Sequence, residues 1–145
     1  MKIQDVMTRN VEIVRPDSTI KEAAEKMKTF DVGSVPVCEG DRMIGIVTDR
    51  DVTLRATAAG LDPNQTKVRD VMTQEVVYCR PDQEVREATA LMEQKKIRRL
   101  AVLDDNKRLI GIVSLGDIAL DNQDDRLTGE VLERISEPSA PKKTA

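Results

Sequence analysis

The sequence contains no histidine and no tryptophan, and it has only one phenylalanine and one tyrosine among 145 residues. Histidine is the commonest general base and the commonest metal ligand, so its absence argues against triad enzymes and histidine-bound metals. With a formal net charge of −3 and so few aromatic rings, the chain offers neither a basic groove nor a base-stacking platform. We therefore expect no nucleic-acid partner, no metal site and no catalytic residues.

Cysteine and long apolar runs are scarce as well. Cys38 and Cys79 lie in apolar, strand-like segments without CxxC spacing, which favours small buried residues over metal or redox ligands. The apolar runs are too short to span a membrane, and the opening MKIQDVMT lacks the apolar core of a signal peptide. These features predict a globular, cytoplasmic protein without a membrane segment.

The most informative feature is an internal repeat. The tetrapeptide DVMT occurs at 5–8 and at 70–73, and the same shift of 65 residues aligns 11–27 with 76–92. After one extra residue near Asn106 the shift becomes 66, and six of the 11 positions from 42 to 52 are then identical. A repeat of about 60 residues is marginally stable alone. We therefore expect two copies packed about a pseudo-twofold axis.

Each repeat shows the same order of expected elements. A short strand, about 11–14 or 76–79, precedes Arg-Pro-Asp, whose aspartates Asp17 and Asp82 are expected to cap the next helix. Apolar stripes at helical spacing follow, formed by Ile20, Ala23, Ala24 and Met27 in the first repeat and by Val85, Ala88 and Met92 in the second. Two β-rich runs and a second helix, 49–59 or 115–120, complete each copy, and 127–135 is expected to form a terminal helix.

This order predicts an α/β (α+β) fold of two βαββα repeats. The expected boundaries are 1–60 for the first repeat, 61–67 for the joint, 68–122 for the second repeat, 123–136 for the C-terminal helix and 137–145 for a mobile tail.

A hydroxyl and an acid stand three residues apart at the same place in each repeat, as Thr48 and Asp51 and as Ser114 and Asp117. One interpretation is a capping box, because [ST]-x-x-[DE] after a strand is typical of a helix start. The other is a ligand site, because a helix start favours phosphate and a carboxylate can accept both hydrogens of a ribose cis-diol. The two interpretations are compatible. Apolar strand-end side chains such as Ile46 and Ile112 could hold an adenine without any aromatic residue.

Two adjacent arginines, Arg98 and Arg99, form the other unusual feature. Neighbouring residues of a strand point to opposite faces, so at least one of the two is expected to face inward or toward the other repeat. A buried guanidinium without a partner would be costly. A carboxylate would satisfy it structurally, and a phosphate would satisfy it functionally, which suits the forked donors of arginine.

Taken together, DVMT, the Arg-Pro-Asp turn, the amphipathic helix and R-h-I-G-I-V-[ST]-x-x-D resemble a tandem pair of CBS (cystathionine β-synthase) domains, or Bateman module. The resemblance covers about residues 1–120 and extends to stand-alone bacterial two-CBS proteins such as hypoxic response proteins. It implies two βαββα units packed through their sheets, a homodimer, and clefts between the units that bind AMP, ADP, ATP, NAD or S-adenosylmethionine.

The resemblance also assigns roles to residues. In one cleft it implies Asp117 on the ribose, Ser114 on the phosphate and Ile112 against the base. The facing repeat would contribute Thr8, Asn10, Val32, Gly33 and Ser34. In the other cleft it implies Asp51, Thr48 and Ile46, with Thr73 and Ile97 opposite. Arg98 and Arg99 occupy the family's basic positions for phosphate, where the first repeat has Gly33 and Ser34, so the clefts should differ in charge and affinity.

The sequence thus predicts a non-catalytic regulatory module that binds an adenosine nucleotide, AMP or ATP first of all, and passes a ligand-shifted conformation to a protein effector. One alternative is a dimeric interaction scaffold whose pockets stay empty. A second is a carboxylate-based hydrolase that uses Asp49, Asp51 or Asp117.

Overall fold

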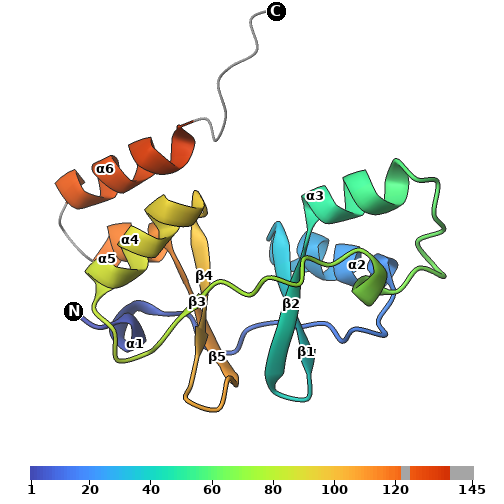
Figure 1. Ribbon diagram of the computed structural model, residues 1–145, viewed down its shortest axis with the longest axis horizontal. Helices are drawn as coiled ribbons and strands as arrows, with labels where there is room; N and C mark the ends of the chain where they lie inside the picture. The colour runs from blue at the N-terminus through green and yellow to red at the C-terminus, as the bar shows by residue number, and fades with distance from the viewer. Residues whose placement is uncertain (122–124, 138–145) are drawn as a thin grey trace, which may run out of the picture. The chain divides into compact units, whose positions relative to one another are not determined.

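The computed structural model describes residues 1–121 and 125–137, and the chain falls into two compact units (Figure 1). Unit 1 comprises Met1–Arg9, Tyr78–Asp105 and the chain from Ile110 onward, and unit 2 comprises Asn10–Val77 and Asn106–Leu109. Most of the expected mobile tail, residues 138–145, lies outside the described residues. The mixture of helix and strand confirms the predicted α+β class.

Unit 2 is built around an antiparallel hairpin. Strands β1 (Ser34–Glu39) and β2 (Arg42–Thr48) pair with a bulge at Val37 and Cys38, and Val14 adds a parallel bridge to Val37. Helix α2 (Ile20–Phe30) precedes the hairpin, and the short α3 (Asp49–Asp51), the π-helix η1 (Val52–Thr57) and the 3₁₀-helix η2 (Val68–Asp70) follow it. The core combines α2 and hairpin residues with Ala56, Val68 and Val71.

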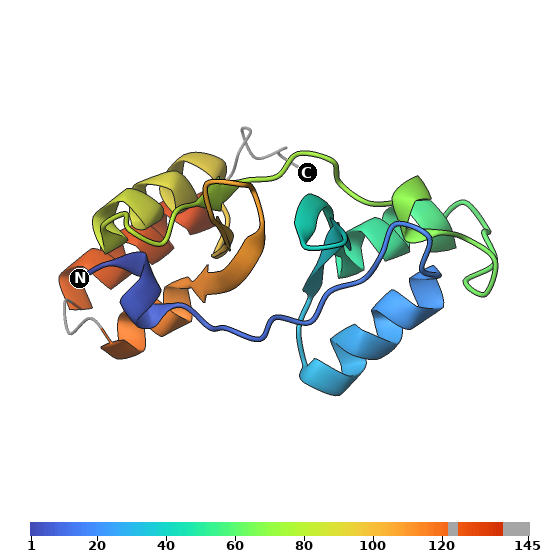
Figure 2. The same cartoon turned by 90° about the horizontal axis from the view of Figure 1, so that it is seen from below.

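Unit 1 repeats this order and adds a helix. Its sheet has the order β3-β4-β5, with β3 (Tyr78–Cys79) parallel to β4 (Arg99–Leu103), and β5 (Leu109–Ser114) at the other edge. The helices are α1 (Ile3–Val6), α4 (Val85–Lys95), α5 (Leu115–Asp121) and α6 (Asp125–Ser136). Figure 2 shows α4 and α6 side by side, a packing that buries Val131 and Ile135. The predicted terminal helix is thereby confirmed.

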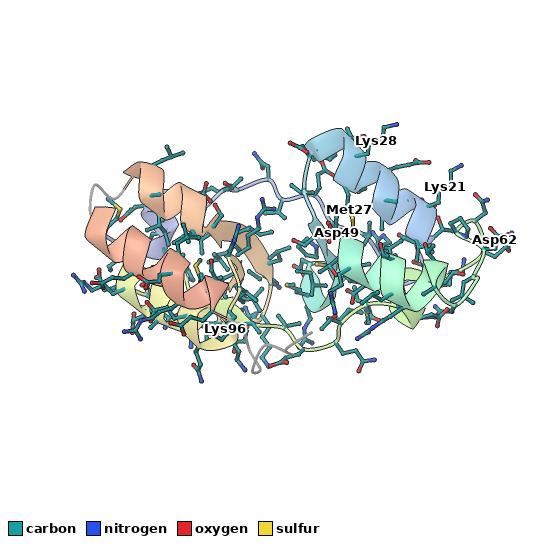
Figure 3. The ribbon with its side chains drawn as sticks, turned by 90° about the horizontal axis from the view of Figure 1, so that it is seen from above. Lys21, Met27, Lys28, Asp49, Asp62 and Lys96 are labelled. Atoms are coloured by element: carbon teal, nitrogen blue, oxygen red, sulfur yellow. The ribbon has the colours of Figure 1, made fainter. Side chains whose placement is uncertain are left out.

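The apolar stripes of the first helices are confirmed with one exception. Ile20, Ala23 and Met27 are buried in α2, whereas Ala24 is exposed. In Figure 3, Lys21 and Lys28 project outward from the same helix. The corresponding face of α4 is buried at Val85, Ala88 and Met92, and additionally at Thr89.

The prediction that Asp17 and Asp82 cap these helices is wrong. In unit 2, Ser18 N donates to Arg15 O (3.0 Å), and this turn delays the helix. Thr19 is the cap instead, and its hydroxyl accepts from Glu22 N (3.2 Å). Unit 1 has the same turn, and there Glu84 is the cap; its backbone N–H donates to Oε2 of Glu87 (2.8 Å), the reverse direction of the bond in unit 2. A proline after the arginine suits the second position of a turn, and the helix therefore begins later.

The second helices of the two repeats differ in kind. The predicted 115–120 appears as the regular helix α5, but the predicted 49–59 is α-helical only to Asp51 and continues as a π-helix to Thr57. In this wider turn the N–H of Ala58 donates to the carbonyl of Thr53, five residues back (2.9 Å). Of the predicted first strand, 11–14, only Val14 pairs with a neighbouring strand.

Candidate functional site

The hydroxyl–acid pairs form capping boxes in both units. In unit 2, Thr48 N donates to Oδ2 of Asp51 and Asp51 N donates to Oγ1 of Thr48, each at 3.0 Å. In unit 1 the same two bonds join Ser114 and Asp117, again at 3.0 Å. The capping interpretation is therefore confirmed for both pairs. It leaves each hydroxyl proton, and one oxygen of each carboxylate, available for a further contact.

The DVMT tetrapeptides place a threonine beside each capping box. Thr8 exchanges backbone hydrogen bonds with Ile112 (2.7 and 2.9 Å), and Thr73 does so with Ile46 (2.8 and 2.9 Å). Each DVMT segment thus pairs with the strand of the other repeat. The compact units therefore divide the chain differently from the repeat order, because 1–9 joins the strands of the second copy.

A glycine makes this approach possible in each unit. A Cβ atom on Gly45 would lie 2.8 Å from Thr73 O and 2.9 Å from Sδ of Met72. A Cβ atom on Gly111 would lie 2.9 Å from Thr8 O and 2.8 Å from Sδ of Met7. These distances are closer than a side chain tolerates, so the shared glycine of GIVT and GIVS is explained by close backbone approach.

Asp51 is buried and strongly engaged within unit 2. Asp51 is only 7% exposed, and the hydroxyl of Thr73 lies 3.2 and 3.3 Å from its two carboxylate oxygens. Nε of Arg55 lies 3.8 Å from Oδ1 of Asp51. The same guanidinium donates through Nη1 to the carbonyls of Val71 (3.2 Å) and Met72 (3.0 Å). Asp51 therefore serves as a structural centre of its unit.

Asp117 has the same capping bonds but a more open setting. Its side chain is half-buried, and among the described residues its Oδ1 has no hydrogen-bond partner. Thr8, which corresponds to Thr73, is exposed, and its hydroxyl makes no hydrogen bond within the described part of the chain. Asp117 thus keeps one carboxylate oxygen without a partner among the described residues, whereas both oxygens of Asp51 are engaged.

The charges near the two boxes also differ. Leu115 N donates to the carbonyl of Arg98 (2.9 Å), so the arginine pair starts beside the Ser114–Asp117 box. In unit 2, Asp49 N donates to the carbonyl of Gly33 (2.9 Å), and Oδ2 of Asp49 lies 3.1 Å from the place of a Cβ on Gly33. Figure 3 labels Asp49 at the start of α3. The cationic Arg98 of unit 1 therefore corresponds to the uncharged Gly33 in unit 2, beside which the acidic Asp49 lies.

The expectation that one arginine needs a partner to offset burial is not met. Arg98 and Arg99 are both exposed, and neither forms an ion pair with another described residue. An exposed guanidinium remains hydrated, so it carries no desolvation penalty that a carboxylate must offset. Both side chains remain available to an anion.

The other predicted ligand residues are divided between the units. Unit 2 holds the exposed Asn10 and Gly33 and the half-buried Val32 and Ser34, and unit 1 holds the half-buried Ile97. Ile46 and Ile112 are both half-buried beside their capping boxes. The resemblance placed Thr8 opposite Asp117 and Thr73 opposite Asp51, on facing halves of a cleft. In the structure Thr8 lies in the same unit as Asp117, and Thr73 lies in the same unit as Asp51.

A groove between α4 and α6 was not predicted. It is lined by Ala90, Glu93, Gln94, Lys96, Glu130, Glu133, Arg134 and Glu137. Arg134 Nη1 lies 3.8 Å from Glu93 Oε2, and Lys96 Nζ lies 3.9 Å from Glu137 Oε2 and donates to Arg134 O (3.1 Å). Its walls are charged and largely paired with one another. The repeat analysis could not reveal it, because α6 has no counterpart in the first copy.

The cysteines behave as small buried residues, as predicted. Both are buried and free, and burial raises the pKa of each thiol to about 11. A nearby Asp41 adds to the increase in the pKa of Cys38. Within the described residues no cluster of three or more acidic or cysteine side chains is suited to a metal ion, and no helix is long and apolar enough to cross a bilayer.

Known proteins share this organisation. The CBS domain model matches residues 3–56 and 68–120. The CBS domain-containing protein YhcV of Bacillus subtilis is 44% identical over 134 residues, which cover 92% of this chain and 94% of that protein. Hypoxic response protein 1 of Mycobacterium tuberculosis is 35% identical over 117 residues, covering 80% of this chain and 81% of its own length.

A solved structure extends the likeness to three dimensions. The crystal structure of CBSX2 in complex with AMP superposes with a TM-score of 0.73 at 25% identity, covering 86% of this chain and 98% of that one. The residues matched by the family model span both units and include both capping boxes and both DVMT segments. The chain therefore belongs to the CBS domain family and carries two CBS domains.

Proposed function

We propose that this protein is a regulatory adenine-nucleotide sensor whose ligand is held in unit 1 by Asp117. The carboxylate accepts the ribose cis-diol, and the Ser114 hydroxyl proton, which the capping bond leaves unused, donates to a phosphate. The observation that supports this most is the half-buried Asp117 carboxylate, with one oxygen bonded to Ser114 N and the other without a partner among the described residues.

Charge supports a phosphate-bearing ligand rather than a bare nucleoside. Arg98 and Arg99 are exposed, unpaired within the described chain, and joined to the start of α5 through the Leu115–Arg98 backbone bond. A guanidinium binds phosphate through two parallel charge-assisted hydrogen bonds. The half-buried Ile112 on β5 offers an apolar surface for the base. AMP and ATP are the first ligands to test, since a related CBS structure contains AMP.

The output is a change of population, not chemistry. A ligand that binds one arrangement of the protein tenfold better than another favours it by about 1.4 kcal/mol. That is enough to bias a contact with an effector protein. We propose that the protein acts in the cytoplasm and as a homodimer. Light scattering on the purified protein tests the homodimer, because it measures the molar mass in solution.

Thermal-shift titration tests the proposal. At millimolar concentration, AMP, ATP, NAD or S-adenosylmethionine should raise the Tm of the full chain if its Kd lies well below that concentration. Asp117→Asn should remove the shift, whereas Asp82→Asn, which alters an exposed carboxylate of the same unit outside the site, should retain it. If no compound shifts the wild-type Tm, the nucleotide proposal fails and a ligand-free scaffold becomes the better account.

A separate incubation tests the carboxylate-based hydrolase. ATP recovered intact after hours with the protein would exclude it.

A further inference from the structure

The two CBS acids share one local motif but have different surroundings, and this difference carries an inference that rests on the proposed function. We infer that Arg55 and Thr73 form an internal clamp that closes the Asp51 carboxylate to ligands, so that each chain binds one nucleotide, at Asp117. The clamp consists of the contacts among Asp51, Arg55, Thr73 and the carbonyls of Val71 and Met72.

The clamp is built from two segments of unit 2. Arg55 lies in η1, and its Nη1 reaches the carbonyls of Val71 and Met72, at 3.2 and 3.0 Å. These carbonyls lie directly before Thr73, whose hydroxyl bonds to Asp51. The guanidinium therefore holds the DVMT segment against the helix that carries the acid. Opening the carboxylate would break several contacts at once.

The shape of the helix contributes to this arrangement. The chain widens into a π-helix directly after Asp51, and this π-helix carries Arg55, whose guanidinium reaches the carbonyls of Val71 and Met72. Unit 1 has the regular helix α5 instead, and at the shift of 66 its counterpart of Arg55 is the acidic Asp121. A carboxylate cannot donate to backbone carbonyls, so the second repeat does not encode the same clamp.

The occupied oxygens explain why a ribose would not bind at Asp51. In both acids Oδ2 accepts a capping N–H, from Thr48 in Asp51 and from Ser114 in Asp117, so the difference lies in the remaining acceptor capacity of each carboxylate. In Asp51 the Thr73 hydroxyl faces both oxygens and the guanidinium of Arg55 lies near Oδ1. The side chain is only 9% exposed. A diol would therefore have to displace Thr73 and pass Arg55 to reach it.

Charge strengthens the distinction between the two acids. The exposed Asp49 lies beside Gly33 in unit 2, and Gly33 is the counterpart of Arg98 in unit 1. A phosphate arriving near Asp51 would face a second carboxylate, whereas unit 1 has the exposed Arg98 next to its capping box, where the Arg98 carbonyl accepts from Leu115 N. Like charges at short distance oppose binding, and opposite charges favour it.

Calorimetric titration with AMP on the full chain measures the number of sites. We expect one equivalent per chain for the wild type, at least a 100-fold weaker affinity for Asp117→Asn, and an affinity within twofold of wild type for Asp51→Asn. Two equivalents in the wild type, or the loss of one site in Asp51→Asn, would overturn the clamp while leaving the proposed function intact.

Arg55→Gln tests the guanidinium itself, with Arg50→Gln as the matched control, because Arg50 is an exposed neighbour whose side chain has no partner among the described residues. Releasing the clamp should allow a second, weaker equivalent of AMP in Arg55→Gln and none in Arg50→Gln. Unchanged stoichiometry in a folded Arg55→Gln protein would contradict the inference.

A readout without ligand separates this inference from the proposed function. Asp51→Asn should lower the Tm more than Asp117→Asn does, because only Asp51 has the additional contacts to Thr73 and Arg55. Equal losses would overturn the clamp. If AMP fails to bind the wild type but the Tm losses differ as expected, the nucleotide proposal falls and the structural role of Asp51 stands.

Discussion

Units 1 and 2 use one sequence pattern for two purposes. The capping bonds of Thr48–Asp51 and Ser114–Asp117 have the same lengths, yet one acid is 7% exposed and linked to Thr73, and the other is half-buried with a free oxygen. The residues that distinguish the two acids are not the shared hydroxyl and carboxylate but Arg55, Asp49 and the arginine pair. A duplicated motif therefore marks where a site can form, and its neighbours decide whether it is open.

The largest expected effect concerns what the units share. Gly45→Ala and Gly111→Ala should each lower the free energy of unfolding by about 1–3 kcal/mol, since the new methyl group would overlap a backbone carbonyl and a methionine sulfur. Urea denaturation measures both. Gly129→Ala is the control, because nothing lies within 4 Å of its Cβ position in α6 and alanine favours a helix by up to about 1 kcal/mol. A loss of stability for only one of the two glycine variants would show that the DVMT segments do not approach their strands equally closely.

The next prediction concerns the cations found only in unit 1. Arg99→Ala should weaken ATP binding about tenfold, equivalent to about 1.4 kcal/mol, while adenosine binding changes little. Competition titrations at fixed ionic strength compare the two ligands. Arg50→Ala in unit 2 removes an equal charge as the control. An equal loss for adenosine and ATP would mean that Arg99 acts on the fold rather than on the phosphate.

A smaller effect should distinguish the two DVMT threonines. Thr73→Val should cost about 1 kcal/mol of stability, because it removes the hydroxyl that bonds to buried Asp51. Thr8→Val should be nearly neutral in the absence of ligand, since the exposed Thr8 hydroxyl has no partner among the described residues. Chemical denaturation of both variants tests this difference. Similar losses would indicate that the units are more alike than their hydrogen bonds suggest.

The smallest contrast is expected between the cysteines. Burial raises the pKa of Cys38 and Cys79 from 9.0 to about 11, one thiol in each unit. Between these values the unfolded chain binds fewer protons than the folded chain, so the stability present below pH 9 should fall as pH rises toward 11. Denaturation at pH 8 and pH 10.5 measures the loss, with Cys38→Ala and Cys79→Ala compared separately. A rise in stability over this window would contradict the assignment of buried thiols.

Local patterns allowed much of the fold to be predicted. The apolar stripes of α2 and α4 and both capping boxes depend on residues three or four positions apart, which the sequence displays directly. The caps at Asp17 and Asp82 were predicted wrongly because the turn after each arginine postpones the helix. The repeat also indicated the family, because each motif occurred twice in the same order.

The surroundings of the acids could not be predicted in the same way. Thr73 lies 22 residues from Asp51, and the contact exists only because β2 pairs with the DVMT segment. Arg55 is four residues from Asp51, a spacing that helices use commonly for exposed pairs, so its reach to Val71 and Met72 was not visible. The ligand roles of the remaining residues stay predictions.

The exchange of DVMT segments between the repeats determines which fragments of the chain can fold. A fragment ending at the joint would retain Thr8 without Ile112 and Ile46 without Thr73, and so would leave two orphaned strand edges. Neither half should be portable by itself. A protein with a single copy of the repeat would need the DVMT segment of a second molecule to complete its strand pairing. In the duplicated chain both segments belong to the same molecule.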